Sequence, residues 1–239
     1  MTEQLADIWV YLAARPLLSL TLTLIAYQAG LWASRKAGMH PLANPVLIAV
    51  ILLVAMLAGT GTPYQTYFEG AQFVHFLLGP ATVALALPLY RQIERVKTSA
   101  LAIAASLIAG TLTAILTAVG TAWLLGASEA TLVSIAPKSV TAPVAMGISE
   151  QLGGLPSLTA VLVILTGILG AAVGPLVLNL VRVKDWAARG FALGTASHGI
   201  GTARALQVNE LAGAFAGLAM GLNALATSLL LPLLWRLLF

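Results

Sequence analysis

The chain alternates long uncharged, apolar runs with short clusters of charged residues. Six runs predict membrane-spanning helices, because a helix that crosses the hydrocarbon core needs about 20 mostly apolar residues. They are 16–34, 45–60, 73–90, 98–126, 155–181 and 211–235. Basic residues follow several of them, as Arg35 and Lys36 follow the first. The pattern therefore predicts an all-α integral membrane protein, a polytopic bundle of helices.

Two further apolar segments, 130–152 and 186–207, carry polar residues and helix breakers at their centres. These residues are Pro137, Lys138, Ser139, Thr141 and Pro143 in the first, and Gly194, Thr195, Ser197, His198, Gly199, Gly201 and Thr202 in the second. Non-helical backbone at membrane depth is tolerated only where it is buried in protein or lines a watery cavity. Paired interrupted segments indicate the binding site of a transporter. We therefore expect two broken helices whose breaks meet near the midplane.

A weak internal repeat appears when the chain is shifted by 115 positions. The shift lays 45–60 on 160–175 and 98–124 on 213–239. It also lays Gly79, Pro80 and Thr82 on the second break, which makes them a third candidate break. We expect two membrane repeats of inverted topology, 1–126 and 127–239, an arrangement common among secondary carriers.

The topology depends on whether 130–152 crosses the membrane or is re-entrant. Basic loops concentrate on the cytoplasmic side. With Arg35 and Lys36 inside, Arg182 and Lys184 also fall inside only if 130–152 is re-entrant. We prefer that alternative, with the N-terminus outside and the C-terminus inside.

Composition agrees with this class of protein and excludes several others. Of the 239 residues, 59% are hydrophobic and only 8% are charged, whereas soluble domains carry about 25% charged residues. The chain has no cysteine, so it forms no disulfide and no thiolate site. Its net charge of +4 is too sparse for a nucleic-acid partner. No P-loop and no metal-ligand spacing occurs, so we expect no enzyme, no cofactor and no metal. With Glu3 and Asp7 near its start, the chain shows no cleavable signal peptide.

Lys138 is the principal candidate for an anion-binding residue. A lysine at the bilayer centre costs about 2.5–3.5 kcal/mol on insertion scales, so a cavity, partner or ligand must compensate. It is predicted to receive a substrate carboxylate, with Ser139 and Thr141 donating hydrogen bonds beside it. Alternatively, it extends to the membrane surface or pairs with Glu129 or Glu150.

The second broken segment offers hydroxyls, a histidine and an arginine. Thr195, Ser197 and Thr202 are candidate hydrogen-bond partners of a substrate. His198, with an unperturbed pKa of about 6.5, is a candidate for proton coupling or for a plain packing role. Arg204 binds a carboxylate, faces the membrane surface or pairs with Glu210.

Several other residues are expected to support the bundle. Asn223, an isolated amide in the last span, is interpreted as a bridge between helices. Glycines at 167, 170 and 174, and at 213, 217 and 221, form small-residue faces for close packing. The second set also suggests a homodimer.

Four stretches resemble the LrgB/CidB family of membrane proteins. They are PKSVTAPVAMGISE (137–150), ALGTASHGIGTARA (192–205), LAMGLNALAT (218–227) and LLGPATVALALPLY (77–90). The resemblance covers roughly residues 40–239. It implies one of two roles: transport of small carboxylates, as in the plastid glycolate/glycerate translocator, or holin- or antiholin-like control of murein hydrolases and lysis. It also implies a small LrgA/CidA-like membrane partner and a bacterial-type inner (cytoplasmic) membrane.

Taken together, these observations predict a multi-pass secondary transporter of small hydroxymonocarboxylates such as glycolate, glycerate, lactate or pyruvate. A holin-like protein is the alternative. Two separate polar breaks favour the carrier, because polar groups at membrane depth are costly and a simple oligomeric pore does not need them.

Overall fold

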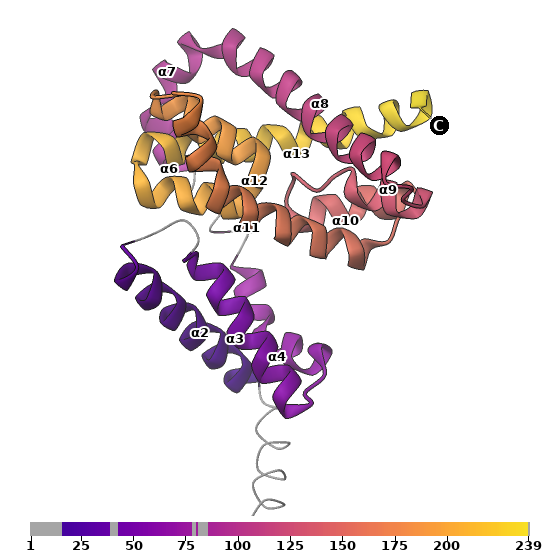
Figure 1. Ribbon diagram of the computed structural model, residues 1–239. Helices are drawn as coiled ribbons and strands as arrows, with labels where there is room; N and C mark the ends of the chain where they lie inside the picture. Colours follow the sequence, from indigo (N-terminus) through magenta and orange to yellow (C-terminus); the bar gives the residue numbers. More distant parts are fainter. Residues whose placement is uncertain (1–15, 39–42, 78–79, 81–85, 239) are drawn as a thin grey trace, which may run out of the picture. The chain divides into compact units, whose positions relative to one another are not determined.

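The computed structural model describes residues 16–38, 43–77, 80 and 86–238. The chain divides into two compact units, Met1–Ala84 and Leu85–Phe239 (Figure 1). Among the described residues, four helices are long and apolar enough to cross a membrane. They are Leu17–Lys36, Ala100–Leu124, Pro156–Leu180 and Glu210–Leu237. The all-α membrane fold expected from the sequence is confirmed.

The first unit contains three helices, α2 (Pro16–Lys36), α3 (Pro45–Thr60) and α4 (Tyr64–Phe76). The side-chain oxygen of Asn44 accepts hydrogen bonds from the first free amides of α3 and so fixes where that helix begins. Any side chain at Gly30 would overlap the carbonyl of Pro45, so α2 approaches α3 closely only with glycine there. The hydroxyls of Thr23 and Tyr67, 2.6 Å apart, join α2 to α4.

The expected span 73–90 does not form one helix among the described residues. α4 ends at Phe76, and α6 (Ala86–Arg91) begins ten residues later. A run without charged residues indicates that a segment is compatible with lipid. It does not show that the segment forms one continuous helix. Of the third candidate break, Gly79 and Thr82 lie outside the described residues. α3 is also short, because its 16 residues reach only about 24 Å at about 1.5 Å per residue.

The second unit is built around three long helices, α8, α11 and α13. Its helices are α6, α7 (Ile93–Thr98), α8 (Ala100–Leu124), α9 (Glu129–Ile135), α10 (Ala142–Gln151), α11 (Pro156–Leu180), α12 (Trp186–Val208) and α13 (Glu210–Leu238). Leu107 of α8 packs near Phe215 of α13, and further along Val119 packs near Trp235. α8 and α13 therefore run in the same direction, side by side (Figure 1).

The segment that contains α9 and α10 enters and leaves at one end of this unit. α9 has 7 residues and α10 has 10, so each is too short to cross a core about 30 Å thick. Ala127, just before α9, and Leu152, just after α10, pack against one hydrophobic cluster that includes Trp235. Both ends therefore lie beside the C-terminal part of α13, and the segment is re-entrant.

Buried hydroxyls fasten this re-entrant segment to the start of α11. The Thr159 hydroxyl lies 2.8 Å from the hydroxyl of Ser149 and 3.0 Å from the carbonyl oxygen of Ser134. The amide of Leu155 donates to the Ser134 hydroxyl at 2.8 Å. Because all three hydroxyl side chains are buried, these bonds are shielded from water and hold α9 and α10 together at their base.

α12 is also re-entrant, because its backbone breaks at Ser197 and His198. Their φ and ψ angles are −130° and 16°, and 41° and −132°. The first arm of α12 runs parallel to α13, with Gly194 against the backbone of Ala216. After the break the chain doubles back, and Gly201 packs against the carbonyl of Leu193.

Two ion pairs place both ends of α12 at the same end of the unit. Asp185, which caps the start of α12, pairs with Arg95 at 2.8 Å. Glu210, which begins α13 directly after α12, pairs with Arg91 at 3.3 Å. Arg91 and Arg95 are one helical turn apart along the chain. The α9–α10 segment and α12 therefore enter the bundle from opposite ends.

The re-entrant path of α12 changes the position that the sequence predicts for the end of α13. A fully crossing 186–207 segment would have returned the end of the chain to the side of the basic residues. Because α12 turns back, α13 starts beside Arg91 and Arg95 and ends at the opposite end of the unit. The positive-inside rule predicts that the basic end faces the cytoplasm, and with that orientation α13 would end outside. The division into repeats at 126 and 127 stays a prediction.

Candidate binding cavity between two opposed re-entrant segments

The two breaks meet at Asn223, near the middle of α13. Its side-chain amide donates hydrogen bonds to the carbonyl oxygens of Ser139 at 3.3 Å and Thr195 at 3.0 Å. Its side-chain oxygen accepts from the hydroxyl of Thr111 on α8, at 2.6 Å. Asn223 is 1% exposed. The two breaks therefore meet in this structure, and Asn223 connects them to α8; a role of Asn223 in the functional site stays a prediction.

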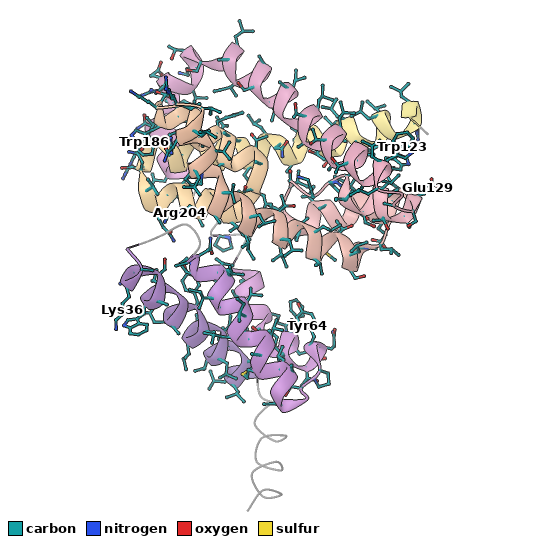
Figure 2. All side chains as sticks on the ribbon, viewed as in Figure 1. Lys36, Tyr64, Trp123, Glu129, Trp186 and Arg204 are labelled. Carbon is teal, nitrogen blue, oxygen red and sulfur yellow. The ribbon has the colours of Figure 1, made fainter. Side chains whose placement is uncertain are left out.

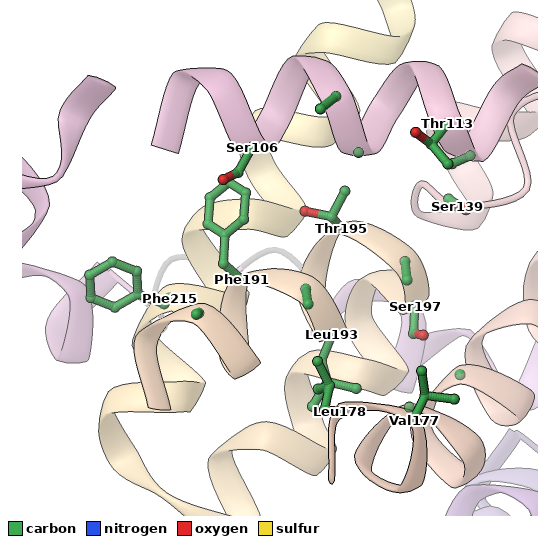
Figure 3. A pocket seen from close by; sticks show the side chains of 18 of the residues that line it. Ser106, Thr113, Ser139, Val177, Leu178, Phe191, Leu193, Thr195, Ser197 and Phe215 are labelled. Carbon is green, nitrogen blue, oxygen red and sulfur yellow. The ribbon is translucent and has the colours of Figure 1, made fainter. Parts of the chain in front are cut away.

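Beside this junction lies a cavity of about 1140 Å³, bounded by α8, α11 and α12 (Figure 3). Most of its lining is apolar. The polar and charged residues among its lining are Ser99, Ser106, Thr113, Lys138, Ser139, Thr166, Asp185, Thr195 and Ser197. Such a site, apolar with a few polar groups, is typical for a small organic ligand. Because Asp185 and Ser99 belong to the basic end, the cavity extends from that end towards the midplane junction.

Lys138 is the one cationic residue that lines the described cavity. Its ammonium nitrogen lies 3.3 Å from the hydroxyl of Ser139, and most of its side chain is removed from solvent. No carboxylate among the described residues lies within ion-pair distance of it. The alternative in which Lys138 pairs with Glu129 or Glu150 is therefore not seen, and both glutamates are exposed.

Thr195 and Ser197 line the cavity from the first arm of α12 (Figure 3). Both hydroxyl oxygens are buried, and neither has a hydrogen-bond partner among the described residues. A buried hydroxyl without a partner costs about 1–3 kcal/mol. A ligand with oxygen atoms would offset this cost, so the pair suits a hydroxyl or carboxylate group.

Four other predicted ligands do not line this cavity. His198 is buried, and its Nε2 lies 2.9 Å from the carbonyl oxygen of Val163. The Thr202 hydroxyl donates to the His198 carbonyl at 2.8 Å, and this bond stabilises the broken backbone at His198. Thr141 directly precedes α10 and makes no side-chain hydrogen bond to its first turn, and Arg204 lies half-buried on the second arm of α12. Contact of these four residues with a substrate stays a prediction.

The helix breakers shape the two breaks. Pro137 is buried in the turn before α10, and Pro143 occupies the first turn of that helix, where a missing amide is harmless. On α12, Gly199 lies near the Met220 sulfur. The expected small-residue face on α11 is confirmed, because side chains at Gly167 and Gly174 would overlap His198 and Leu193 of α12.

Sequence reasoning missed several lining residues, including Ser106, Thr113 and Thr166. A single hydroxyl in an apolar run carries little signal, because serine and threonine often bond only to their own helix backbone. Phe191 and Phe215 were missed for a similar reason, since aromatic residues are common in any apolar helix. Among the described residues, no cluster of acidic or histidine side chains suited to a metal ion occurs.

Replacing Gly170 by alanine should impair the cavity. The added methyl group would overlap the Ser197 hydroxyl, so that hydroxyl must move. We expect a loss of about 1–3 kcal/mol in stability from overpacking, and about a tenfold weaker apparent affinity if the hydroxyl contacts a charged substrate. Thermal unfolding in detergent and ligand titration measure the two effects.

Gly120→Ala is the matched control, because nothing lies within 4 Å of its added methyl. This change should leave affinity unaltered and stabilise α8 by up to about 1 kcal/mol. Equal affinities for the two variants and the unchanged protein would contradict a role for the Ser197 hydroxyl in binding.

Fold and cavity together define a class: a multi-pass helical membrane protein with a polar junction near the middle of α13, formed by two opposed re-entrant segments. The chain belongs to the LrgB-like family, which matches residues 23–237.

Named relatives agree with that assignment. The uncharacterized protein YwbG of Bacillus subtilis is 37% identical over 191 residues, covering 80% of this chain and 85% of its own. The holin-like protein CidB of Staphylococcus epidermidis is 34% identical over 217 residues, covering 91% and 94%. CidB of Staphylococcus aureus is 33% identical over 218 residues, covering 91% and 95%. No solved structure matches the chain.

Proposed function

We propose that this protein is a secondary transporter of small hydroxymonocarboxylates such as glycolate, glycerate, lactate or pyruvate, in the cytoplasmic membrane of a bacterium. One observation carries the proposal. Among the described residues, Lys138 lines this cavity without a carboxylate partner, together with Thr195 and Ser197, whose buried hydroxyls have no hydrogen-bond partner. A monocarboxylate with an adjacent hydroxyl or oxo group complements that set.

The cavity also suits one step of alternating access. It extends to the basic, cytoplasmic end, where Asp185 and Ser99 line it. At the opposite end, α9 and α10 close the bundle around a hydrophobic cluster that includes Ile115, Val133 and Leu231. We therefore interpret this conformation as open to the cytoplasm, with movement of one bundle against another opening the other side.

A holin-like role is the second candidate, and the names of the staphylococcal relatives favour it. It predicts flux that does not saturate and does not discriminate among solutes of similar size. A small LrgA/CidA-like partner, a homodimer and proton coupling through His198 stay predictions. The His198 ring already contacts the carbonyl of Val163, so coupling draws no support from the cavity.

Uptake into proteoliposomes tests the proposal. Labelled glycolate, glycerate, lactate and pyruvate should enter with saturable kinetics, and an excess of one unlabelled substrate should compete with it. Labelled glycerol, similar in size but uncharged, serves as the control. Non-saturable entry of acids and glycerol alike would favour the holin-like role and contradict the carrier.

A further inference from the structure

A second, smaller pocket lies at the cytoplasmic end of α11, apart from the carboxylate cavity. Its volume is about 330 Å³. Its lining consists of Asn179, Arg182, Val183, Lys184, Trp186 and Arg189. Three of these six residues are cations, and none is acidic. We propose that this pocket binds the phosphodiester headgroup of an anionic phospholipid.

The cations of this pocket are not neutralised by the protein. Asp185 is the nearest acid along the chain, but both of its carboxylate oxygens are engaged elsewhere. One accepts from the amide of Ala188 at 2.9 Å and the other from Arg95 at 2.8 Å. Among the described residues, no carboxylate pairs with Arg182, Lys184 or Arg189. The pocket therefore presents an uncompensated positive charge.

One of the two arginines, Arg189, is held in place before any ligand arrives. Arg189 donates to the carbonyl of Val183 at 2.7 Å, and its guanidinium lies 5.3 Å from the centre of the Trp186 ring. A guanidinium has five N–H donors, so others remain for phosphate oxygens. Arg182 ends α11 with a φ of 58°, at a left-handed position that glycine usually takes. An arginine there indicates that its side chain is needed.

The position of the pocket selects a lipid over a free phosphate ion. α11 crosses the membrane, so its end lies at the bilayer surface. Trp186 is exposed at this end of the unit, away from Trp123 and Glu129 at the other end (Figure 2), as expected for an interfacial aromatic residue. Below the pocket, Leu180 and Leu176 expose apolar surface on α11, along which an acyl chain can lie.

Lipid titration of the full-length protein in micelles tests this site. The readout is the number of retained lipids by native mass spectrometry, with phosphatidylglycerol compared to zwitterionic phosphatidylcholine. The test protein carries Arg182→Gly and Lys184→Gln. Glycine fits the left-handed position, so the first change removes a cation without straining α11. Each cation near a membrane surface contributes about fivefold to anionic lipid binding, so the double variant should lose about 30-fold of the preference.

The matched control carries Arg236→Gln and Lys97→Gln. It removes the same two charges, from the far end of α13 and from a lysine already paired with Glu94. It should keep the full preference for phosphatidylglycerol. Equal preference in the test variant and the unchanged protein would overturn the proposal. Inorganic phosphate that displaces phosphatidylglycerol at millimolar concentration would overturn the lipid assignment in favour of a free-phosphate site.

Discussion

Replacing Lys138 by alanine should reduce substrate uptake at low concentration by about 100-fold. Lys138 is the one cation lining the described cavity, and no protein carboxylate pairs with it. Truncating one partner of a buried, hydrogen-bonded charge pair costs about 2–5 kcal/mol. A loss of about 3 kcal/mol corresponds to roughly 100-fold in binding. Initial rates in proteoliposomes, across substrate concentrations, measure it.

Stability separates the binding role of Lys138 from a structural one. A buried ammonium group without an acidic partner carries a desolvation cost, so its removal should leave the unfolding midpoint unchanged or raise it. A lysine that anchored the fold would instead lower the midpoint when removed. Uptake that survives in Lys138→Ala, with the midpoint reduced, would make Lys138 structural and would remove the main support for the carrier.

Lys97→Ala is the control for the charge itself. Lys97 is exposed and pairs with Glu94 within α7, so its loss should change uptake little. Lys138→Arg tests whether the shape of the cation matters, because it keeps the charge while adding bulk. Partial uptake in the arginine variant would indicate that charge dominates recognition, and that shape adds to it.

Replacing Asn223 by leucine should cost about 2–5 kcal/mol in stability and abolish uptake. The change keeps the volume but leaves three buried groups without a partner: the Thr111 hydroxyl and the carbonyls of Ser139 and Thr195. In membranes, side-chain hydrogen bonds average only about 0.6 kcal/mol, which sets the lower end. Each unsatisfied buried group in soluble proteins costs about 1–3 kcal/mol, and three groups at about 1.7 kcal/mol each give the upper end of the range.

The loss of uptake follows from where these groups lie. Ser139 and Thr195 both line the cavity, and Asn223 holds their backbones together. Thermal unfolding and substrate titration of the same preparation measure both effects. Ser228→Ala, which removes a bond only to the carbonyl of Ala224 in the same helix, is the control. Wild-type uptake in Asn223→Leu would show that the junction is not required for the site.

Much of this protein followed from the order of its residues alone. Long uncharged runs determined the membrane class, because no other solvent accommodates 59% hydrophobic residues with so few charges. Prolines and glycines around polar residues located both breaks, because these residue types interrupt a helix wherever it lies. Lys138, Ser139, Thr195 and Ser197 were predicted for the same reason, since polar groups at membrane depth need a cavity or a partner.

The tertiary structure decided how these parts are used. Thr141, His198, Thr202 and Arg204 are polar residues beside helix breakers, like the cavity residues, but none of the four lines the cavity: Thr141 lies at the start of α10, and the other three lie at or after the break in α12. Ser106 and Thr113 gave no signal, yet the packing of α8 brings them to the lining. The re-entrant path of α12 was equally hidden. It depends on contacts of Gly194 with Ala216 and of Asp185 with Arg95, which join residues distant in the chain. The local sequence pattern indicates which environment and which backbone breaks a segment can adopt. Contacts between segments determine which of its side chains face the cavity.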